Sequence, residues 1–205
     1  MLAQGGGLHA RIVARAGWRP RVVLVAGACT IGLFAALFGV QGGLEVHVLD
    51  RVATGPKGQL VADLGATFHT GDVTDIGVTP DVVIECTGHG PLVFELAEVV
   101  APDAVICLTG ISSGTRTVTI GLDQLNKAMV LENTVLFGSV NAGRRHYQQA
   151  ADALAKADRR WLERLITRRV PMSGFADALH KNAYDVKVVV DLNIEPVEGV
   201  TAAVK

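Results

Sequence analysis

Hydrophobic residues in this sequence fall into short aliphatic runs, separated by stretches long enough to form helices. Most of the runs are rich in Val, Ile and Leu and lack a polar residue at every second position. This pattern is typical of strands that are buried on both faces of a parallel sheet. The predicted strands are Val22–Val25, Glu45–Leu49, Thr67–His69, Val82–Cys86, Val105–Leu108, Thr134–Phe137 and Lys187–Val190.

Helical segments separate these strands. The predicted helices are Ile31–Val40, Gly58–Leu64, Leu92–Val100, Leu122–Leu131, Arg144–Ala157 and Phe175–His180. In the stretch from Arg144, the residues Tyr147, Ala150, Ala151 and Leu154 form an apolar stripe at helical spacing. The alternation predicts an α/β fold with one doubly wound parallel sheet of about six or seven strands and helices on both faces. Because no repeat or interdomain linker interrupts the pattern, we expect a single domain.

A glycine turn follows the first predicted strand and opens a helix. It reads Gly27-Ala28-Cys29-Thr30-Ile31-Gly32, and Asp50 ends the second strand 23 residues after Gly27. This is the arrangement of a Rossmann dinucleotide-binding unit, in which the helix N-terminus faces the pyrophosphate and the acid faces the ribose. Cys29 stands where that motif has its middle glycine, so we expect weak cofactor binding. A phosphate loop of nucleoside triphosphatases is excluded, because Leu33-Phe34 replace its Lys and Ser/Thr.

Small and polar residues follow three further strands. These segments are Asp81–Gly88, Thr109–Ser113 and Ser139–Asn141. Strand ends at this edge of a doubly wound sheet line its ligand crevice. A purely structural interpretation stays open for each of them: Gly88 and Gly110 would only turn the chain, and Asn141 would only cap a helix.

Composition narrows the class of protein. The chain has 205 residues, 19 Lys and Arg against 20 Asp and Glu, and three cysteines. Near-zero net charge gives no reason to expect nucleic acid as a partner, and three dispersed cysteines favour a reducing cytoplasm over a disulfide framework. The uncharged run from Val22 to Leu44 leaves a membrane-spanning alternative open. We prefer a strand, a turn and a helix there, because glycines interrupt the run.

No catalytic pattern is evident. Tyr147 and Tyr184 lack the lysine four residues later that a short-chain dehydrogenase needs, and the six histidines show no metal-binding spacing. Cys86 is interpreted as a small core residue, and Arg168-Arg169 as a solvated surface. We therefore predict no catalytic residue and no metal site within this chain.

Six segments together resemble a known family. They are Val22–Gly32, Asp81–Gly88, Cys107–Gly114, Leu131–Tyr147, Trp161–Pro171 and Val186–Leu192. They are similar to the C-terminal cofactor domain of glucose dehydrogenases, which are zinc-dependent relatives of medium-chain alcohol dehydrogenases. The resemblance covers roughly residues 8–193 and is most specific around Gly138–Tyr147.

The resemblance implies a role for each matching position. The pyrophosphate would lie at Gly27, Thr30, Ile31 and Gly32, and the adenosine ribose at Asp50, Arg51 and Val52. The nicotinamide would lie beside Thr109, Gly110 and Ile111. A cofactor loop would consist of Ser139, Val140 and Asn141, with Asn141 also reaching the sugar substrate, and Lys187 would contact the cofactor. The implied cofactor is NAD or NADP. We expect NAD to bind at least as well, because Asp50 repels a 2′-phosphate while Arg51 partly offsets that repulsion.

The resemblance also implies what the sequence lacks. We expect residues 1–20 to be an N-terminal helix remnant or tail, 21–193 the Rossmann domain and 194–205 a C-terminal tail. The family's zinc-bearing catalytic domain has no counterpart here, so we expect a truncated or split cytoplasmic dehydrogenase that does not oxidise an aldose at C1 by itself. The expected partner is a separate zinc-bearing catalytic chain or, through the apolar surface that the missing domain would cover, a second copy of this chain. The alternative is a non-catalytic nucleotide-sensing or scaffolding module.

Overall fold

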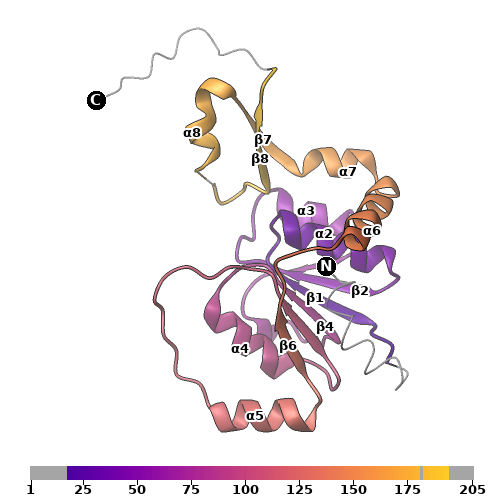
Figure 1. Cartoon of the computed structure of the whole chain (residues 1–205), viewed down its shortest axis with the longest axis vertical. Coiled ribbons are helices and arrows are strands. Elements are labelled where there is room, and N and C mark those ends of the chain that lie inside the picture. Colours follow the sequence, from indigo (N-terminus) through magenta and orange to yellow (C-terminus); the bar gives the residue numbers. More distant parts are fainter. Residues whose placement is uncertain (1–17, 181, 194–205) are drawn as a thin grey trace.

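Six parallel strands form the central sheet of the computed structural model, which describes residues 18–180 and 182–193. The strands are β1 (Val22–Ala26), β2 (Glu45–Leu49), β3 (Thr67–His69), β4 (Val82–Glu85), β5 (Val105–Leu108) and β6 (Val135–Gly138). Their order in the sheet is β3-β2-β1-β4-β5-β6 (Figure 1). Strand β1 is central, and the order reverses direction between β1 and β4. The predicted doubly wound Rossmann fold is confirmed.

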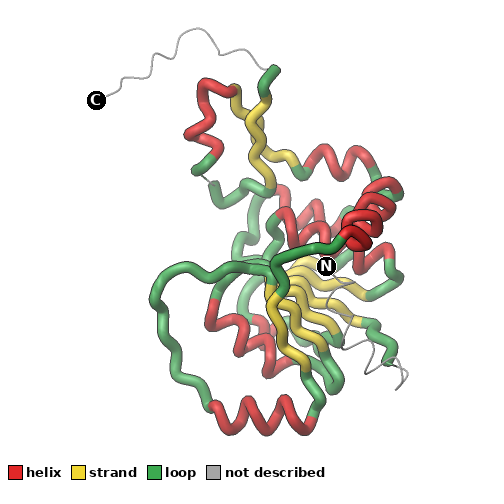
Figure 2. The backbone as a smooth tube through the Cα atoms, viewed as in Figure 1, coloured by secondary structure: helices red, strands yellow, loops and turns green. Residues whose placement is uncertain are grey.

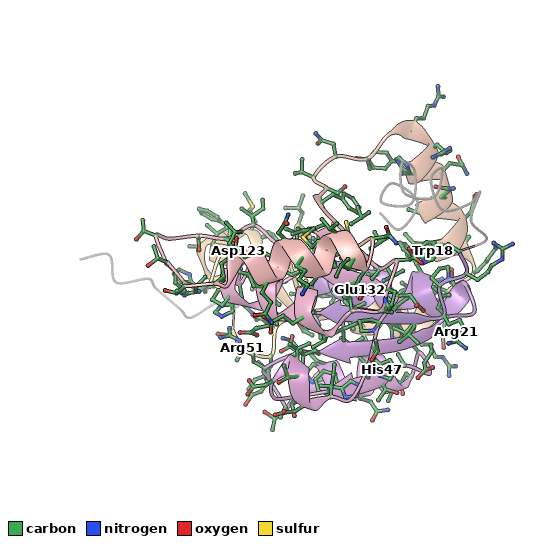
Figure 3. All side chains as sticks on the ribbon, turned by 90° about the horizontal axis from the view of Figure 1, so that it is seen from below. Trp18, Arg21, His47, Arg51, Asp123 and Glu132 are labelled. Carbon is green, nitrogen blue, oxygen red and sulfur yellow. The ribbon has the colours of Figure 1, made fainter. Side chains whose placement is uncertain are left out.

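Helices cover both faces of this sheet. They are α2 (Thr30–Gln41), α3 (Pro56–Ala62), α4 (Gly90–Val99), α5 (Leu122–Leu131), α6 (Arg144–Ala155), α7 (Arg159–Arg164) and α8 (Phe175–Ala178), with short 3₁₀ turns at Val73–Asp75 and Met172–Gly174. Helices α2, α3 and α6 lie on one face and α4 lies on the other (Figure 1). Helix α5 packs against α4, with Asp123 in its first turn and Glu132 at its C-terminal end (Figure 3).

A second, two-stranded sheet lies apart from the main one. Strand β7 (Ile166–Pro171) pairs in parallel with β8 (Lys187–Asp191), and neither joins the six-stranded sheet (Figure 2). The strand predicted from Lys187 therefore lies outside the main sheet, and β7 and α7 were not predicted. Residues 1–17 and 194–205, which hold most of the predicted tails, lie outside the described residues.

The uncharged run from Val22 to Leu44 consists of β1, a turn and α2. Four of the five residues of β1 and six of the twelve residues of α2 are buried. Among the described residues, no helix has the length and apolar character needed to cross a bilayer.

Helix α7 ties the C-terminal part of the chain to α3. Trp161 is almost completely buried, and its indole Nε1–H donates to the Leu60 carbonyl at 2.8 Å. Arg164 forms an ion pair with Asp63 just beyond the end of α3.

The predicted apolar stripe on α6 is only partly buried. Leu154 packs against the core, whereas Tyr147 is exposed.

Two histidines stack on neighbouring strands. His47 Nδ1 lies 2.8 Å from His69 Nε2, and His47 Nε2 lies 2.9 Å from a carboxylate oxygen of Glu45. His47 is buried. Burial lowers the pKa of His69, and the charge on His47 lowers it further. The state in which both imidazoles are positively charged is therefore disfavoured.

This pair predicts a stability that decreases in mild acid. The pKa of His69 is lower in the folded chain than its ordinary value of 6.5, so the unfolded chain binds the proton more readily just below that pH. The free energy of unfolding should be fully retained above about pH 6.5 and should fall as the pH drops towards the lowered pKa. Urea denaturation at several pH values measures it. His69→Gln should flatten this dependence, whereas His180→Gln, just beyond α8, should leave it unchanged.

Candidate functional site

The C-terminal ends of the parallel strands bring the predicted site residues to one edge of the sheet. Loops after β1, β2, β5 and β6 carry nearly all of them. The reversal of strand order between β1 and β4 opens a crevice at this edge, which is where ligands bind in doubly wound sheets. The geometry of each loop decides what the crevice can hold.

The glycine turn after β1 is tight at two positions. Gly27 has φ of +105°, and a Cβ there would lie 2.9 Å from the methyl carbon of Thr87. A Cβ on Gly32 would lie 1.8 Å from the Gly27 carbonyl oxygen, so α2 approaches the turn as closely as only glycine allows. Both glycines therefore let the chain turn from β1 directly into α2.

The N-terminus of α2 faces this crevice. Cys29 is its N-cap residue, with φ of −84°, and its side chain makes no capping hydrogen bond. The first-turn N–H groups have no carbonyl partner within the helix, and the helix dipole favours an anion there. Thr30, which the sequence places at the pyrophosphate, donates its hydroxyl to the Val186 carbonyl at 2.8 Å. Ile31 is partly exposed beside it.

Asp50 is held by hydrogen bonds from three directions. One oxygen accepts from the Ala28 N–H at 2.8 Å and the other from the Val52 N–H at 2.9 Å. The Lys57 ammonium reaches both oxygens, at 3.0 and 3.2 Å. Burial by itself would raise the pKa of this carboxyl, but the bonds from Val52, Lys57 and Ala28 hold it below its ordinary value. Asp50 is therefore ionised, and it joins the turn after β1 to the loop after β2.

Lys57 is the residue that sequence reasoning missed at this position. It lies in the first turn of α3, and its side chain is only 7% exposed. A carboxylate has about four lone-pair directions, and the Asp50 oxygens receive four contacts from three donors. Asp50 therefore presents a balanced ion pair to the ribose position rather than a bare negative charge. Arg51, next to it, is exposed at the periphery of the molecule (Figure 3).

Strands β4 and β5 form the other wall of the crevice. Glu85 is fully buried, and one of its oxygens accepts from the N–H groups of Thr87 at 2.6 Å and Gly88 at 3.0 Å, as well as from the Thr87 hydroxyl. Thr109 donates its hydroxyl to the Glu85 carbonyl at 2.7 Å. A Cβ on Gly110 would lie 2.2 Å from the Gly88 nitrogen. The two loops therefore pack directly against each other, with Ile111 exposed beyond them.

A cavity of about 470 Å³ lies between α2, α6 and the loop after β6. It brings together three of the predicted cofactor residues, Ile31, Val140 and Asn141. Its remaining lining includes His146 and Tyr147, and it is predominantly apolar. Val140 is 78% exposed at its rim. Ser139 is half-buried at the start of the same loop.

Lys187 comes to the same edge of the sheet from the far end of the sequence. It is exposed at the first position of β8, directly after Val186, whose carbonyl binds Thr30. The fold thus brings Lys187 near Thr30, although the two residues are far apart in the sequence.

Within residues 18–180 and 182–193, no group of three or more His, Cys, Asp or Glu side chains is placed to hold a metal ion. The described residues therefore do not fit a zinc site.

Comparison with known families identifies the chain. The family described as glucose dehydrogenase C-terminus matches residues 3–192. The chain belongs to this family.

Two relatives of this glucose dehydrogenase C-terminal domain illustrate the match. A glucose 1-dehydrogenase of Methanocella arvoryzae is 34% identical over 185 residues, which cover 85% of this chain and 52% of the relative. A glucose 1-dehydrogenase of Thermoproteus tenax is 34% identical over 186 residues, covering 87% of this chain and 52% of the relative. The chain therefore spans about half the length of the curated relatives it matches.

Solved structures agree on the fold. A glucose dehydrogenase from Haloferax mediterranei superposes with a TM-score of 0.77 at 25% identity, covering 90% of this chain and 55% of the other. The same enzyme in complex with NADP, zinc and gluconolactone superposes with a TM-score of 0.80 at 24% identity, covering 94% of this chain and 57% of the other. The resemblance inferred from the sequence is confirmed.

Proposed function

We propose that this chain is a NAD(P)-binding domain of the glucose dehydrogenase type. The observation that supports the proposal most strongly is the turn from Gly27 to Gly32, which leads into the N-terminus of α2 at the reversal point of the sheet. A helix N-terminus at that point presents N–H groups to a pyrophosphate. The Haloferax relative was solved with NADP bound, which supports the same class of ligand here.

Each wall of the crevice has a proposed role in binding the cofactor. The α2 N-terminus would bind the pyrophosphate, and Asp50 with Arg51 and Val52 would lie at the adenosine ribose. Thr109, Gly110 and Ile111 would position the nicotinamide, and Ser139, Val140 and Asn141 would close over it. Lys187 would contact a phosphate from β8. When bound, the nicotinamide ring supplies the hydride acceptor of the reaction.

We further propose that the chain takes part in oxidising the C1 hydroxyl of an aldose, with Asn141 reaching the sugar. This is the reaction implied by its glucose dehydrogenase relatives, which are about twice as long as the matching region. A zinc-bearing partner chain would supply the remaining catalytic groups. The other candidate, a sensing or scaffolding module, shares the fold but needs no hydride transfer.

Calorimetric titration with NAD and NADP tests the cofactor proposal. We expect saturable binding of one cofactor per chain, with competition between the two. Absence of binding at millimolar concentrations would contradict the proposal and favour a scaffolding role. Added glucose should increase the affinity for the cofactor only if the sugar-binding position is formed within this chain.

The cysteine in the turn gives a separate prediction. Its side chain projects at the α2 N-terminus, where pyrophosphate oxygens would approach the backbone, so Cys29→Gly should tighten cofactor binding by up to about tenfold, or about 1.4 kcal/mol. Calorimetry on the wild type and the variant measures the change. Cys107→Ser, in the interior of β5, is the matched control and should not tighten binding. Unchanged or weaker affinity in Cys29→Gly would show that the thiol does not obstruct the cofactor.

A further inference from the structure

Two cysteines that are 57 positions apart in sequence meet at the reversal point of the sheet. Cys29 lies at the N-cap of α2 and Cys86 directly follows β4. The Cys29 thiol donates to the Cys86 carbonyl oxygen at 3.8 Å, and the presence of Cys29 raises the pKa of the Cys86 thiol. Strand pairing explains the approach, because Ala26 and Glu85 are register partners on neighbouring parallel strands.

We propose that Cys29 and Cys86 form a redox-active dithiol in the crevice, which a peroxide oxidises to a disulfide. Both residues are half-buried, so a small oxidant can reach them, whereas Cys107 is buried in β5. Thr109 Oγ1 lies 3.2 Å from the Cys86 sulfur and holds it at the crevice wall. No disulfide joins any of the three cysteines in the structure.

The order of events follows from the surroundings of each sulfur. The hydrogen bond with Cys29, together with burial, raises the pKa of Cys86, so this thiol keeps its proton. Cys29 lies at a helix N-terminus, where the dipole favours a thiolate. Cys29 is therefore the sulfur that attacks the peroxide first, and Cys86 is the resolving thiol.

The reaction balances with a peroxide as the only co-reactant. The Cys29 thiolate attacks one oxygen of hydrogen peroxide, so that an S–O bond forms and the O–O bond breaks. The departing hydroxide takes the proton that Cys29 lost and leaves as water. The Cys86 sulfur then attacks the sulfenic sulfur of Cys29: an S–S bond forms, the S–O bond breaks, and hydroxide leaves with the Cys86 proton as a second water. Two electrons pass from the sulfurs to the peroxide.

The disulfide would join the two walls of the crevice. It would fix the turn after β1 to the residue after β4 and place the bridged sulfurs at the position proposed for the pyrophosphate. This consequence rests on the proposed function, whereas formation of the disulfide does not. Oxidation should therefore weaken cofactor binding by about tenfold or more, and a dithiol reductant should restore it.

Peptide mapping after peroxide treatment tests the dithiol directly. The intact chain should lose about 2 Da, and digestion without reduction should yield a Cys29–Cys86 cross-linked peptide. Cys107→Ser should give the same peptide, whereas Cys86→Ser and Cys29→Ser should not. A bridge that involves Cys107, a bridge between two chains, or oxidation that stops at a sulfenic acid in the wild type would overturn the proposal.

A second measurement separates the dithiol from the cofactor site. Each protein is titrated with NAD before and after peroxide treatment, and each is compared with its own reduced form. The wild type should lose affinity on oxidation, and Cys29→Ser, which lacks the attacking sulfur, should not. If the disulfide forms but the reduced chain binds no cofactor, the proposed function fails and the dithiol stands. If the reduced chain binds NAD and the cross-linked peptide is absent, the dithiol fails alone.

Discussion

Replacing Lys57 by methionine is expected to lower the affinity for NADP at least about tenfold relative to the affinity for NAD, a differential of about 1.4 kcal/mol. In the wild type the Lys57 ammonium balances the charge of Asp50 from 3.0 Å. Methionine keeps most of the volume of the buried stem but leaves the carboxylate uncompensated. The bare charge would accept hydrogen bonds from the ribose hydroxyls and would repel a 2′-phosphate. Competitive titration with both cofactors measures the change.

Two other variants separate this effect from a general loss of positive charge. Arg51→Ala removes an exposed guanidinium from the same loop and should weaken NADP binding without improving NAD binding. Asp50→Ser should move the preference in the opposite direction, towards NADP. An unchanged ratio of the two affinities in Lys57→Met would show that the ion pair does not set cofactor choice. Because Lys57 is buried, its removal should also reduce stability, which denaturation measures independently.

The second large effect is expected at Glu85. Glu85→Ala removes a buried carboxylate and leaves two part-buried N–H groups, those of Thr87 and Gly88, without their acceptor. An unsatisfied donor costs roughly 1–3 kcal/mol when it is fully buried and less when water reaches it, so the free energy of unfolding should fall by about 2 kcal/mol. Urea denaturation at neutral pH measures this loss.

Two substitutions serve as controls for Glu85→Ala: one keeps an acceptor oxygen at this position, and the other replaces a different glutamate. Glu85→Gln retains one acceptor oxygen and should cost less than Glu85→Ala. Glu95→Ala, on the exposed side of α4, should change stability by about 0.5 kcal/mol or less. Equal stabilities of Glu85→Ala and wild type would mean that the turn at Thr87 and Gly88 does not depend on the carboxylate.

Local patterns predict the central sheet well because its strands are buried on both faces. The bounds predicted for Glu45–Leu49, Thr67–His69 and Val105–Leu108 agree with the structure, whereas β1 and β4 differ by one residue at one end and β6 by one residue at each end. Strand β7 was missed because it carries Arg168 and Arg169 within an otherwise β-branched run. Arg168 was interpreted as solvated, but it forms an ion pair at 2.8 Å with Asp185, which is buried.

The site is harder to predict because its interactions join distant residues. The Gly27–Gly32 turn and Asp50 can be recognised from spacing, since both lie within one strand–helix–strand unit. Lys57 cannot be recognised in this way, because nothing in its neighbourhood shows that α3 directs it inward to Asp50. The meeting of Cys29 with Cys86 depends on β1 and β4 being neighbours, which follows from the order of strands and not from any local motif.

Trp161 gives the chain an optical reporter of its own. An indole that is buried and hydrogen-bonded to the Leu60 carbonyl emits at shorter wavelength than one in water. The acceptor belongs to α3, the helix that also carries Lys57. A red shift of this emission therefore signals that α7 has separated from the helix that holds the ion pair with Asp50. In a Trp18→Phe background, where this tryptophan is the sole emitter, fluorescence follows the docking of α7 while circular dichroism follows the helices and strands as a whole.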